Sequence, residues 1–293
     1  MVSVGSGEYT YDVCEDWASL PEGMTFGMVS AVATDSQDRV YAFQRKDPPV
    51  LVFDREGNLV NSWGNGAFLF AHGIHIAEDM VYLTDRDSSV CILYTLDGKP
   101  VQMLGRHGVH SDTGCEVPGE LVPRAAGPFN YPSEIVPSPT GDLYVSDGYR
   151  NARVHRFDNN GALLASWGQP GKHSPGEFHL PHSLLVSQDK VFVCDRENHR
   201  IQVFDMSGEY LEMWTDIQRP MDISADGDGV LYVSEGRVND GPARVSVLDT
   251  AGKVLARFDC RGPGHGSWVD SQGNIYVGLG DVGGIDKFAR QRS

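Results

Sequence analysis

The sequence predicts an all-β protein that folds as a six-bladed β-propeller, and three observations lead to this fold class. Six segments repeat one pattern, a short apolar strand, a turn with Asp or Gly and an aromatic-containing strand, as in PSEIVPSPTGDLYVSDGY and PMDISADGDGVLYVSEGR. A second hairpin follows most of them, with tight-turn sequences such as NNG and AGK. The 34 Gly and 16 Pro of the 293 residues punctuate the strands and form no low-complexity tract. Repeats of about 40–50 residues with four short strands each are typical of propeller blades.

Each blade can be placed along the chain in order. The repeats predict one propeller domain over 1–293, with blades near 29–64, 72–105, 132–168, 181–214, 220–259 and 264–293. The last blade is short of strands, and the N-terminal segment 8–17 has no hairpin partner of its own. We therefore expect 8–17 to join the last blade as its outer strand, which closes the ring and covers an exposed edge. The longest irregular stretch, 105–131, is expected to be a functional loop, with His107 and His110 as candidate lid residues.

The composition disfavours some classes of binding partner. The formal net charge is −16, and so acidic a surface repels nucleic-acid phosphates and anionic membranes. No run approaches the roughly 20 apolar residues of a membrane-spanning helix, and no signal-peptide pattern is visible at the N-terminus. The five cysteines have no CxxC spacing, which favours reduced thiols over disulfides. We expect a cytoplasmic protein that binds neither nucleic acid nor membranes, and its oligomeric state stays open.

Registering the six repeats brings three histidines to one position. The residue at the start of each innermost strand, called here the inner position, reads in blade order Ser30, His72, Ser133, His182, Met221 and His265. Alternate blades of a six-fold ring lie about 120° apart, so the three imidazoles would point inward with near three-fold symmetry. Three neutral imidazoles that leave a fourth position open are the ligand set of a catalytic zinc site. The pattern predicts a divalent metal centre with Zn²⁺ as the expected ion, although Fe, Co, Ni or Cu suit the same ligands.

The remaining histidines are interpreted differently, because they do not share the inner position. A single histidine in a repeat protein is more often a packing or surface residue than a metal ligand. Seven of them are expected on the surface or in loops, namely His75, His107, His110, His155, His173, His179 and His199.

Two further positions follow the second strand of each blade. The acidic position reads Gln44, Asp85, Asp147, Asp195, Glu235 and Leu279, and its carboxylates are expected to make structural hydrogen bonds between blades. The arginine position comes next and reads Arg45, Arg86, Gly148, Arg196, Gly236 and Gly280. A guanidinium at the channel mouth suits a substrate carboxylate, so the three arginines are candidate substrate-binding residues, with a rim salt bridge as the alternative. Tyr149 lies at the matching place of the third blade, where a phenol beside a metal and an arginine could act as a base.

Three strings of the sequence resemble a known family. VSDGYRNARV, PGEFHLPHSLLV and CDRENHRIQVF are similar to segments of peptidyl-α-hydroxyglycine α-amidating lyase, the NHL-repeat half of the peptidylglycine amidating system. The resemblance covers nearly the whole chain and is strongest over 130–215. The functional residues that it implies are the zinc ligands His72, His182 and His265, the active-site tyrosine Tyr149 and the substrate-contacting arginines Arg45 and Arg196. The implied reaction cleaves the C–N bond of a peptidyl α-hydroxyglycine and yields a peptide amide and glyoxylate.

The sequence departs from this family beside the third histidine. Gly266 stands where the family has an Asp that ligates a structural calcium, which argues against a calcium site here. We expect a metal-dependent lyase that acts on a small α-hydroxy-N-acyl acid. Two alternatives stay open, a metal-dependent hydrolase of a lactone, ester or amide, for which Gly266 would widen the pocket, and a non-enzymatic protein-binding module.

Overall fold

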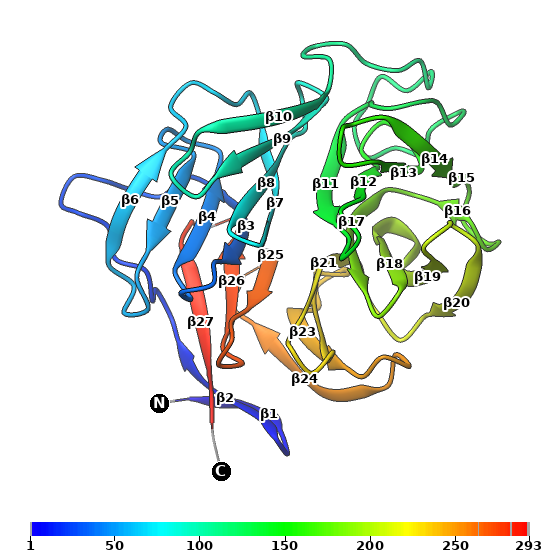
Figure 1. Cartoon of the computed structure of the whole chain (residues 1–293). Helices are drawn as coiled ribbons and strands as arrows, with labels where there is room; N and C mark the ends of the chain where they lie inside the picture. The colour runs from blue at the N-terminus through cyan, green and yellow to red at the C-terminus, as the bar shows by residue number, and fades with distance from the viewer. Residues whose placement is uncertain (1, 263, 282, 292–293) are drawn as a thin grey trace. The chain divides into compact units, whose positions relative to one another are not determined.

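The computed structural model describes residues 2–262, 264–281 and 283–291, and its regular elements are β-strands apart from one short 3₁₀ helix. The strands form six blades, so the chain is a six-bladed β-propeller, as predicted (Figure 1). The blades fall into two compact units, a central unit of residues 68–220 and a terminal unit of residues 1–67 with 221–293. Parts of the predicted sixth blade, residues 282, 292 and 293, lie outside the described residues. No helix in the described ranges is long and apolar enough to cross a membrane.

The central unit holds the second, third and fourth blades (Figure 1). The second blade consists of β7 (Ala71–Ala77), β8 (Met80–Asp85), β9 (Val90–Thr95) and β10 (Pro100–Gly105). The third consists of β11 (Pro132–Pro137), β12 (Leu143–Asp147), β13 (Arg153–Phe157) and β14 (Leu163–Trp167). The fourth consists of β17 (Pro181–Ser187), β18 (Lys190–Asp195), β19 (Arg200–Asp205) and β20 (Tyr210–Trp214), with the 3₁₀ helix η1 (Arg196–Asn198) after β18. A short parallel pair, β15 (Gln169–Pro170) and β16 (Glu177–Phe178), precedes the fourth blade.

The terminal unit holds the first, fifth and sixth blades. The first blade consists of β3 (Val29–Thr34), β4 (Val40–Gln44), β5 (Val50–Phe53) and β6 (Leu59–Trp63). The fifth consists of β21 (Pro220–Ala225), β22 (Leu231–Glu235), β23 (Ala243–Leu248) and β24 (Val254–Cys260). The sixth consists of β25 (Gly264–Val269), β26 (Ile275–Leu279) and β27 (Ile285–Arg290).

The N-terminal segment completes the sixth blade. Strand β2 (Tyr9–Cys14) pairs antiparallel with β27, which confirms the prediction that this segment joins the last blade. The segment also has a hairpin partner, contrary to our expectation, because β1 (Ser3–Ser6) pairs with β2 and extends the blade to five strands. The Gly7 turn, with φ of +57°, supports this hairpin. Tyr11 is fully buried, and its ring lies 5.4 Å from that of Phe258 in the fifth blade.

The apolar core lies between neighbouring blades. Strand side chains alternate in direction, so each blade presents an apolar face to the next blade. In the central unit one cluster joins the second and third blades, including Leu93 and Ile135, and another joins the third and fourth, including Val154 and Val193. This packing fixes the start of each innermost strand, where the predicted metal ligands lie.

A β-bulge interrupts the pairing at the start of five innermost strands. The register shifts between Val29 and Ala31, Ala71 and Ile74, Pro132 and Glu134, Pro181 and Ser183, and Gly264 and Gly266. In each case the inner position falls inside the shift. A bulge turns one side chain away from the regular alternation of a strand. The bulges therefore separate the inner residues, histidines included, from the packed faces of their blades.

Candidate metal centre

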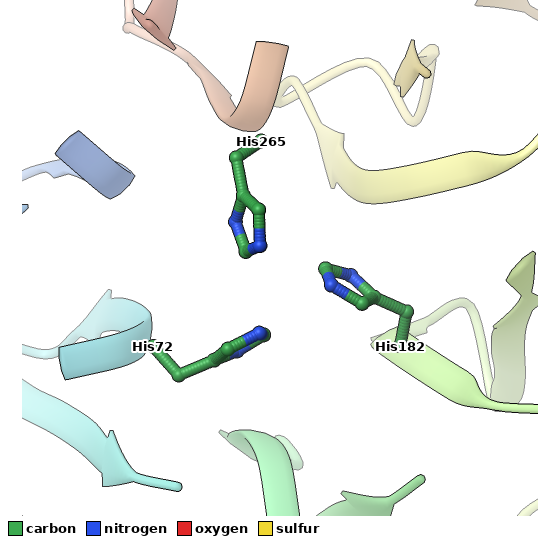
Figure 2. A group of neighbouring side chains, drawn as sticks. All are labelled: His72, His182 and His265. Carbon is green, nitrogen blue, oxygen red and sulfur yellow. The ribbon is translucent and has the colours of Figure 1, made fainter. Parts of the chain in front are cut away.

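His72 and His182 start the innermost strands β7 and β17 of the central unit, and both are 2% exposed. Their rings point toward each other (Figure 2), with centroids 4.8 Å apart. Both side chains come from bulged positions, so the register of two separate blades places them together. The structure thus brings together two of the three histidines predicted as metal ligands within one compact unit.

The tautomer of His72 is set by the third blade. Nδ1 of His72 donates a hydrogen bond to the backbone carbonyl of Ser133, at 2.7 Å. Ser133 occupies the inner position of the neighbouring blade, and Gly73 allows the approach, because a Cβ at Gly73 would lie 2.6 Å from that carbonyl oxygen. With its proton on Nδ1, neutral His72 presents a lone pair at Nε2, as a metal ligand requires.

His265 has the same arrangement within the terminal unit. Its Nδ1 donates to the backbone carbonyl of Ser30, at 2.7 Å, and the side chain is 9% exposed. Gly266 follows it as Gly73 follows His72, and a Cβ at Gly266 would lie 2.5 Å from Ala31 Cα and 2.8 Å from the Ser30 oxygen.

This packing bears on two expectations about Gly266. A longer side chain does not fit there unless the backbone of β3 moves, so the residue cannot be exchanged for a calcium-ligating Asp without a rearrangement. The described residues therefore do not fit the calcium site of the resembling family. In contrast, the expectation that Gly266 widens a pocket is wrong, because the space beside it is filled by Ser30 and Ala31.

Tyr149 lies between the two histidines of the central unit. Its hydroxyl oxygen is 3.0 Å from Nε2 of His72 and 3.0 Å from Nε2 of His182. A phenol has one proton to donate, so it satisfies only one imidazole lone pair. Nε2 of His72 is an acceptor, so the Tyr149 hydroxyl can donate to it. The second contact is satisfied if Nε2 of His182 carries a proton and donates to the Tyr149 oxygen, or if the lone pairs of both imidazoles coordinate a cation. Two imidazole nitrogens that converge beside one phenol are also a donor set that fits a divalent ion.

Tyr149 reaches this place because the third blade carries one extra residue. The Tyr149 amide donates to the carbonyl two residues before the inner position, as do the amides of Arg86 and Arg196 in their blades. Tyr149, and not Gly148, therefore occupies the arginine position of this blade. Gly148 is the inserted residue, and a Cβ there would lie 2.1 Å from the Pro181 carbonyl oxygen. The insertion thus exchanges an arginine for a phenol beside His182.

Two arginines flank Tyr149. Nη1 of Arg196 donates to the Tyr149 hydroxyl at 3.3 Å, and Cζ of Arg86 lies 4.7 Å from the centroid of the Tyr149 ring. Arg86 also lies over the ring of Phe70, at 3.6 Å. Both guanidinium groups are largely buried, with 11% and 13% side-chain exposure for Arg196 and Arg86. The central unit therefore places fixed positive charge beside a phenol and two imidazoles.

Arg45 lies in the terminal unit and has the same backbone anchor. Its amide donates to the carbonyl of Met28, two residues before the inner position Ser30, at 2.9 Å. Its Nη1 lies 2.7 Å from Met28 Sδ. Its predicted role toward a substrate stays a prediction.

In the second, third and fourth blades, the carboxylate at the acidic position acts within its own blade, which corrects our expectation of hydrogen bonds between blades. Asp147 accepts hydrogen bonds from the Asn130 amide and from Asn151, while Asp195 accepts from the His179 amide and from Arg200. Asp85 likewise accepts from the Leu69 and Phe70 amides. Each carboxylate holds the loop that leads into the innermost strand of its own blade. In the second and fourth blades the acid directly precedes the arginine of the arginine position, so the sequence pattern already linked these two positions.

The interpretation of His155 as a surface or loop residue is wrong. His155 lies in β13 and is fully buried, with Nδ1 2.7 Å from Ser166 Oγ and Nε2 3.2 Å from Asp147 Oδ2. It supports the carboxylate that holds the loop before Ser133, so its role is structural.

The stretch 105–131 is tethered beside the site. The Gly119 amide donates to the Tyr149 carbonyl at 2.7 Å, and Arg150 Nε donates to the Cys115 carbonyl at 2.8 Å. His107 and His110 contact Ser88 and Ser89 in the turn after Arg86. The stretch therefore supports the Tyr149 segment from outside.

Comparisons with known proteins agree with the predicted resemblance. Residues 178–204 match the NHL repeat. The chain is 35% identical to human NHL repeat-containing protein 3 over 221 residues, which cover 70% of this chain and 59% of that protein. It is 27% identical to peptidyl-glycine alpha-amidating monooxygenase B of Xenopus laevis, over 95% of this chain and 35% of that protein. It is 29% identical to a probable peptidyl-alpha-hydroxyglycine alpha-amidating lyase of Caenorhabditis elegans, over 61% of this chain and 55% of that protein.

Solved structures show the same fold. A streptogramin B lyase has a TM-score of 0.67 at 14% identity, and the match covers 98% of this chain and 100% of that chain. A gluconolactonase from Xanthomonas campestris has a TM-score of 0.65 at 15% identity, over 91% and 87% of the two chains. The chain spans less than two thirds of the length of each of the three relatives above. The chain is thus a six-bladed propeller that contains an NHL repeat and resembles the α-amidating lyases.

Proposed function

We propose that this protein is a metal-dependent carbon–nitrogen lyase whose metal ligands are His72, His182 and His265. The observation that carries the proposal is the Tyr149 hydroxyl, placed 3.0 Å from Nε2 of His72 and 3.0 Å from Nε2 of His182, two imidazole nitrogens that could bind one ion. The ligand atoms of the three histidines lie within 4.8 Å of one another (Figure 2), which supports the same centre. Relatives named amidating lyases support the reaction class.

The proposed ion is Zn²⁺, because imidazole nitrogens suit zinc and calcium prefers oxygen ligands. Backbone carbonyls hold Nδ1 of His72 and His265, which leaves Nε2 of each to face the ion. When bound, the ion would supply positive charge that stabilises developing negative charge on a substrate oxygen.

The proposed substrate is a small α-hydroxy-N-acyl acid, and its carboxylate is the group that the arginines bind. Arg196 and Arg86 are held beside Tyr149 and offer N–H groups to an anion. Arg45 is proposed as a third carboxylate-binding residue, on the resemblance alone. Binding the carboxylate orients the carbinol carbon relative to Tyr149.

Tyr149 is proposed to accept the proton of the substrate hydroxyl at its Oη, in the deprotonated form of the phenol. As the O–H bond breaks, a C=O bond forms at the carbinol carbon, and the electron pair of the C–N bond goes to nitrogen. The nitrogen takes up a proton and leaves as an amide, and glyoxylate is the second product. Arg196, whose Nη1 lies 3.3 Å from this oxygen, would stabilise the phenolate.

We further propose that the protein works in a reducing, cytoplasmic compartment without nucleic-acid or membrane partners. All five cysteines are free thiols, and four of them are buried. The net charge of −16 disfavours polyanionic surfaces.

The test is glyoxylate release from an N-acyl α-hydroxyglycine by protein loaded with Zn²⁺. The proposal predicts that glyoxylate is released only when the ion is bound. The Tyr149→Phe variant is expected to suppress this release. A parallel panel of lactones, esters and amides tests the hydrolase alternative. Hydrolysis of that panel without glyoxylate release would contradict the lyase, and the absence of both activities from metal-loaded protein would favour a binding module.

A further inference from the structure

Arg196 is held from one side by an acidic neighbour. Its Nε donates to Oε1 of Glu197 at 2.7 Å, while its Nη1 faces Tyr149 at 3.3 Å. The same Glu197 oxygen accepts from Nη2 of Arg219 at 2.8 Å. The Glu197 side chain is 23% exposed, so this pairing is sheltered from solvent. The pKa of Glu197 is lowered: burial acts to raise it, but the charges of Arg196 and Arg219 outweigh that effect.

Arg86 has the same arrangement in the second blade. Its Nε donates to Oδ1 of Asp87 at 2.7 Å, and its guanidinium lies between the rings of Phe70 and Tyr149. The backbone amides of both arginines are fixed by the loop before the innermost strand. The two blades thus share the sequences Asp-Arg-Asp, at 85–87, and Asp-Arg-Glu, at 195–197. In both, the first acid holds the loop, and the last acid holds the Nε of the arginine.

We propose that Glu197 and Asp87 are positioning residues for the anion-binding arginines. A guanidinium is a rigid plane with five N–H donors, and a carboxylate that engages Nε fixes how that plane is turned. In Arg196 this directs Nη1 toward Tyr149. A long, rotamer-rich side chain then loses less entropy when a substrate carboxylate binds. The proposal rests on the proposed function for the identity of the substrate, but the positioning of the two arginines can be tested without turnover.

A purely structural salt bridge would behave differently. Its loss would lower stability and leave the affinity for a carboxylate unchanged. Asp142 provides the matched control, because it pairs with Arg156 in the same unit at similar burial, with 17% and 28% side-chain exposure, and is not part of the site. A control variant Asp142→Ala removes the carboxylate that accepts from Nε of Arg156, an arginine whose Nη1 donates to the Met206 carbonyl.

The first readout is the rate at which phenylglyoxal modifies Arg196, followed by mass spectrometry of the peptide that contains it. Glu197→Ala is expected to raise this rate about fivefold or more, because the freed guanidinium exposes its Nη atoms. Glu197→Gln retains an oxygen that accepts from Nε, so it is expected to stay close to the unmodified protein. An unchanged rate in Glu197→Ala would overturn the proposal, whether or not the protein proves to be a lyase.

The second readout is the binding of glyoxylate to Zn²⁺-loaded protein by calorimetry. Glu197→Ala and Asp87→Ala are each expected to weaken binding about tenfold, with a smaller effect for Glu197→Gln and none for Asp142→Ala. With an active substrate, KM should rise by a similar factor and kcat should change less. Equal losses in Asp142→Ala, or a fall in kcat alone, would contradict a positioning role. If glyoxylate release fails in the unmodified protein while Arg196 becomes more reactive in Glu197→Ala, the lyase fails and the positioning stands.

Discussion

At the scale of single residues, the proposed metal centre depends on the hydrogen-bonding capacity of a few atoms. The backbone carbonyls of Ser133 and Ser30 accept hydrogen bonds from Nδ1 of His72 and of His265, respectively. The sequence could have pointed to both serines, because they alternate with histidines at the inner position. It could not reveal that the carbonyl, and not the hydroxyl, makes the contact, because that depends on how closely two blades approach.

Removal of the Tyr149 hydroxyl tests its proposed role directly. Tyr149→Phe keeps the ring packed between Arg86 and the histidines but removes the oxygen that accepts the proton. We expect kcat to fall about 100-fold or more, the range typical of a lost acid–base group. Metal content should stay the same, since the proposed ligands are imidazole nitrogens. Glyoxylate release measured beside elemental analysis checks both, and a variant with normal kcat would remove Tyr149 from the chemistry.

At the scale of elements, bulges and glycines place the side chains that the repeats bring to one position. The periodic pattern predicts strands and blades, because alternation and turn residues are local signals. It does not predict the register shift at the inner position or the extra residue at Gly148, since both depend on pairing between separate strands. The burial of His155 was missed for a related reason: its partners Asp147 and Ser166 lie on neighbouring strands of the blade.

Gly148 offers a test of how the third and fourth blades approach each other. In Gly148→Ala the new Cβ would meet the Pro181 carbonyl oxygen at 2.1 Å, so the start of β17 must move and carry His182 with it. We expect metal affinity to fall about 10- to 100-fold, as for other changes that displace a metal ligand. Gly127→Ala is the control, because nothing lies within 4 Å of its Cβ. Titration with a competing chelator measures the metal affinity of each variant. Equal affinities of Gly148→Ala and Gly127→Ala would show that this close approach is unimportant for the site.

The closure of the sixth blade by β2 can be tested through Tyr11. This side chain is fully buried against Phe258, so Tyr11→Ala should leave a cavity and cost about 3–5 kcal/mol in the free energy of unfolding. Val60→Ala, at a 53% exposed position of β6, should change stability by less than about 0.5 kcal/mol. Denaturant unfolding compares the two, and a small effect of Tyr11→Ala would mean that β2 contributes little to the blade.

At the scale of the whole molecule, the fold class and the closing strand were predictable from the sequence, because a repeat shows its strand positions six times over. That the six blades make one domain stays a prediction, and so do the substrate, the ion and the compartment. The site is only partly predictable, because it depends on loops and bulges that repeats do not determine. The repeats predict that His72 and His182 lie at equivalent positions. The hydrogen bonds around them depend on how separate blades pack, which the repeats do not predict.

A bound ion should also stabilise the whole molecule. A ligand that binds only the folded state raises its stability by about 2.7 kcal/mol at a free concentration of 100 times its Kd. Chelation should therefore lower Tm, and added Zn²⁺ should restore it. A variant with His72→Ala and His182→Ala should have the lower Tm in both conditions. A Tm that ignores chelation in the unmodified protein would argue against tight binding.

Elemental analysis of the purified protein, made beside a variant that combines His72→Ala, His182→Ala and His265→Ala, determines whether the three histidines hold an ion. A three-histidine centre predicts about one divalent ion per chain in the unmodified protein and none in the variant, with the same β-sheet circular dichroism for both proteins. Absence of a stoichiometric ion from the unmodified protein, even after reloading with Zn²⁺, would contradict the account and leave the three histidines with a structural role.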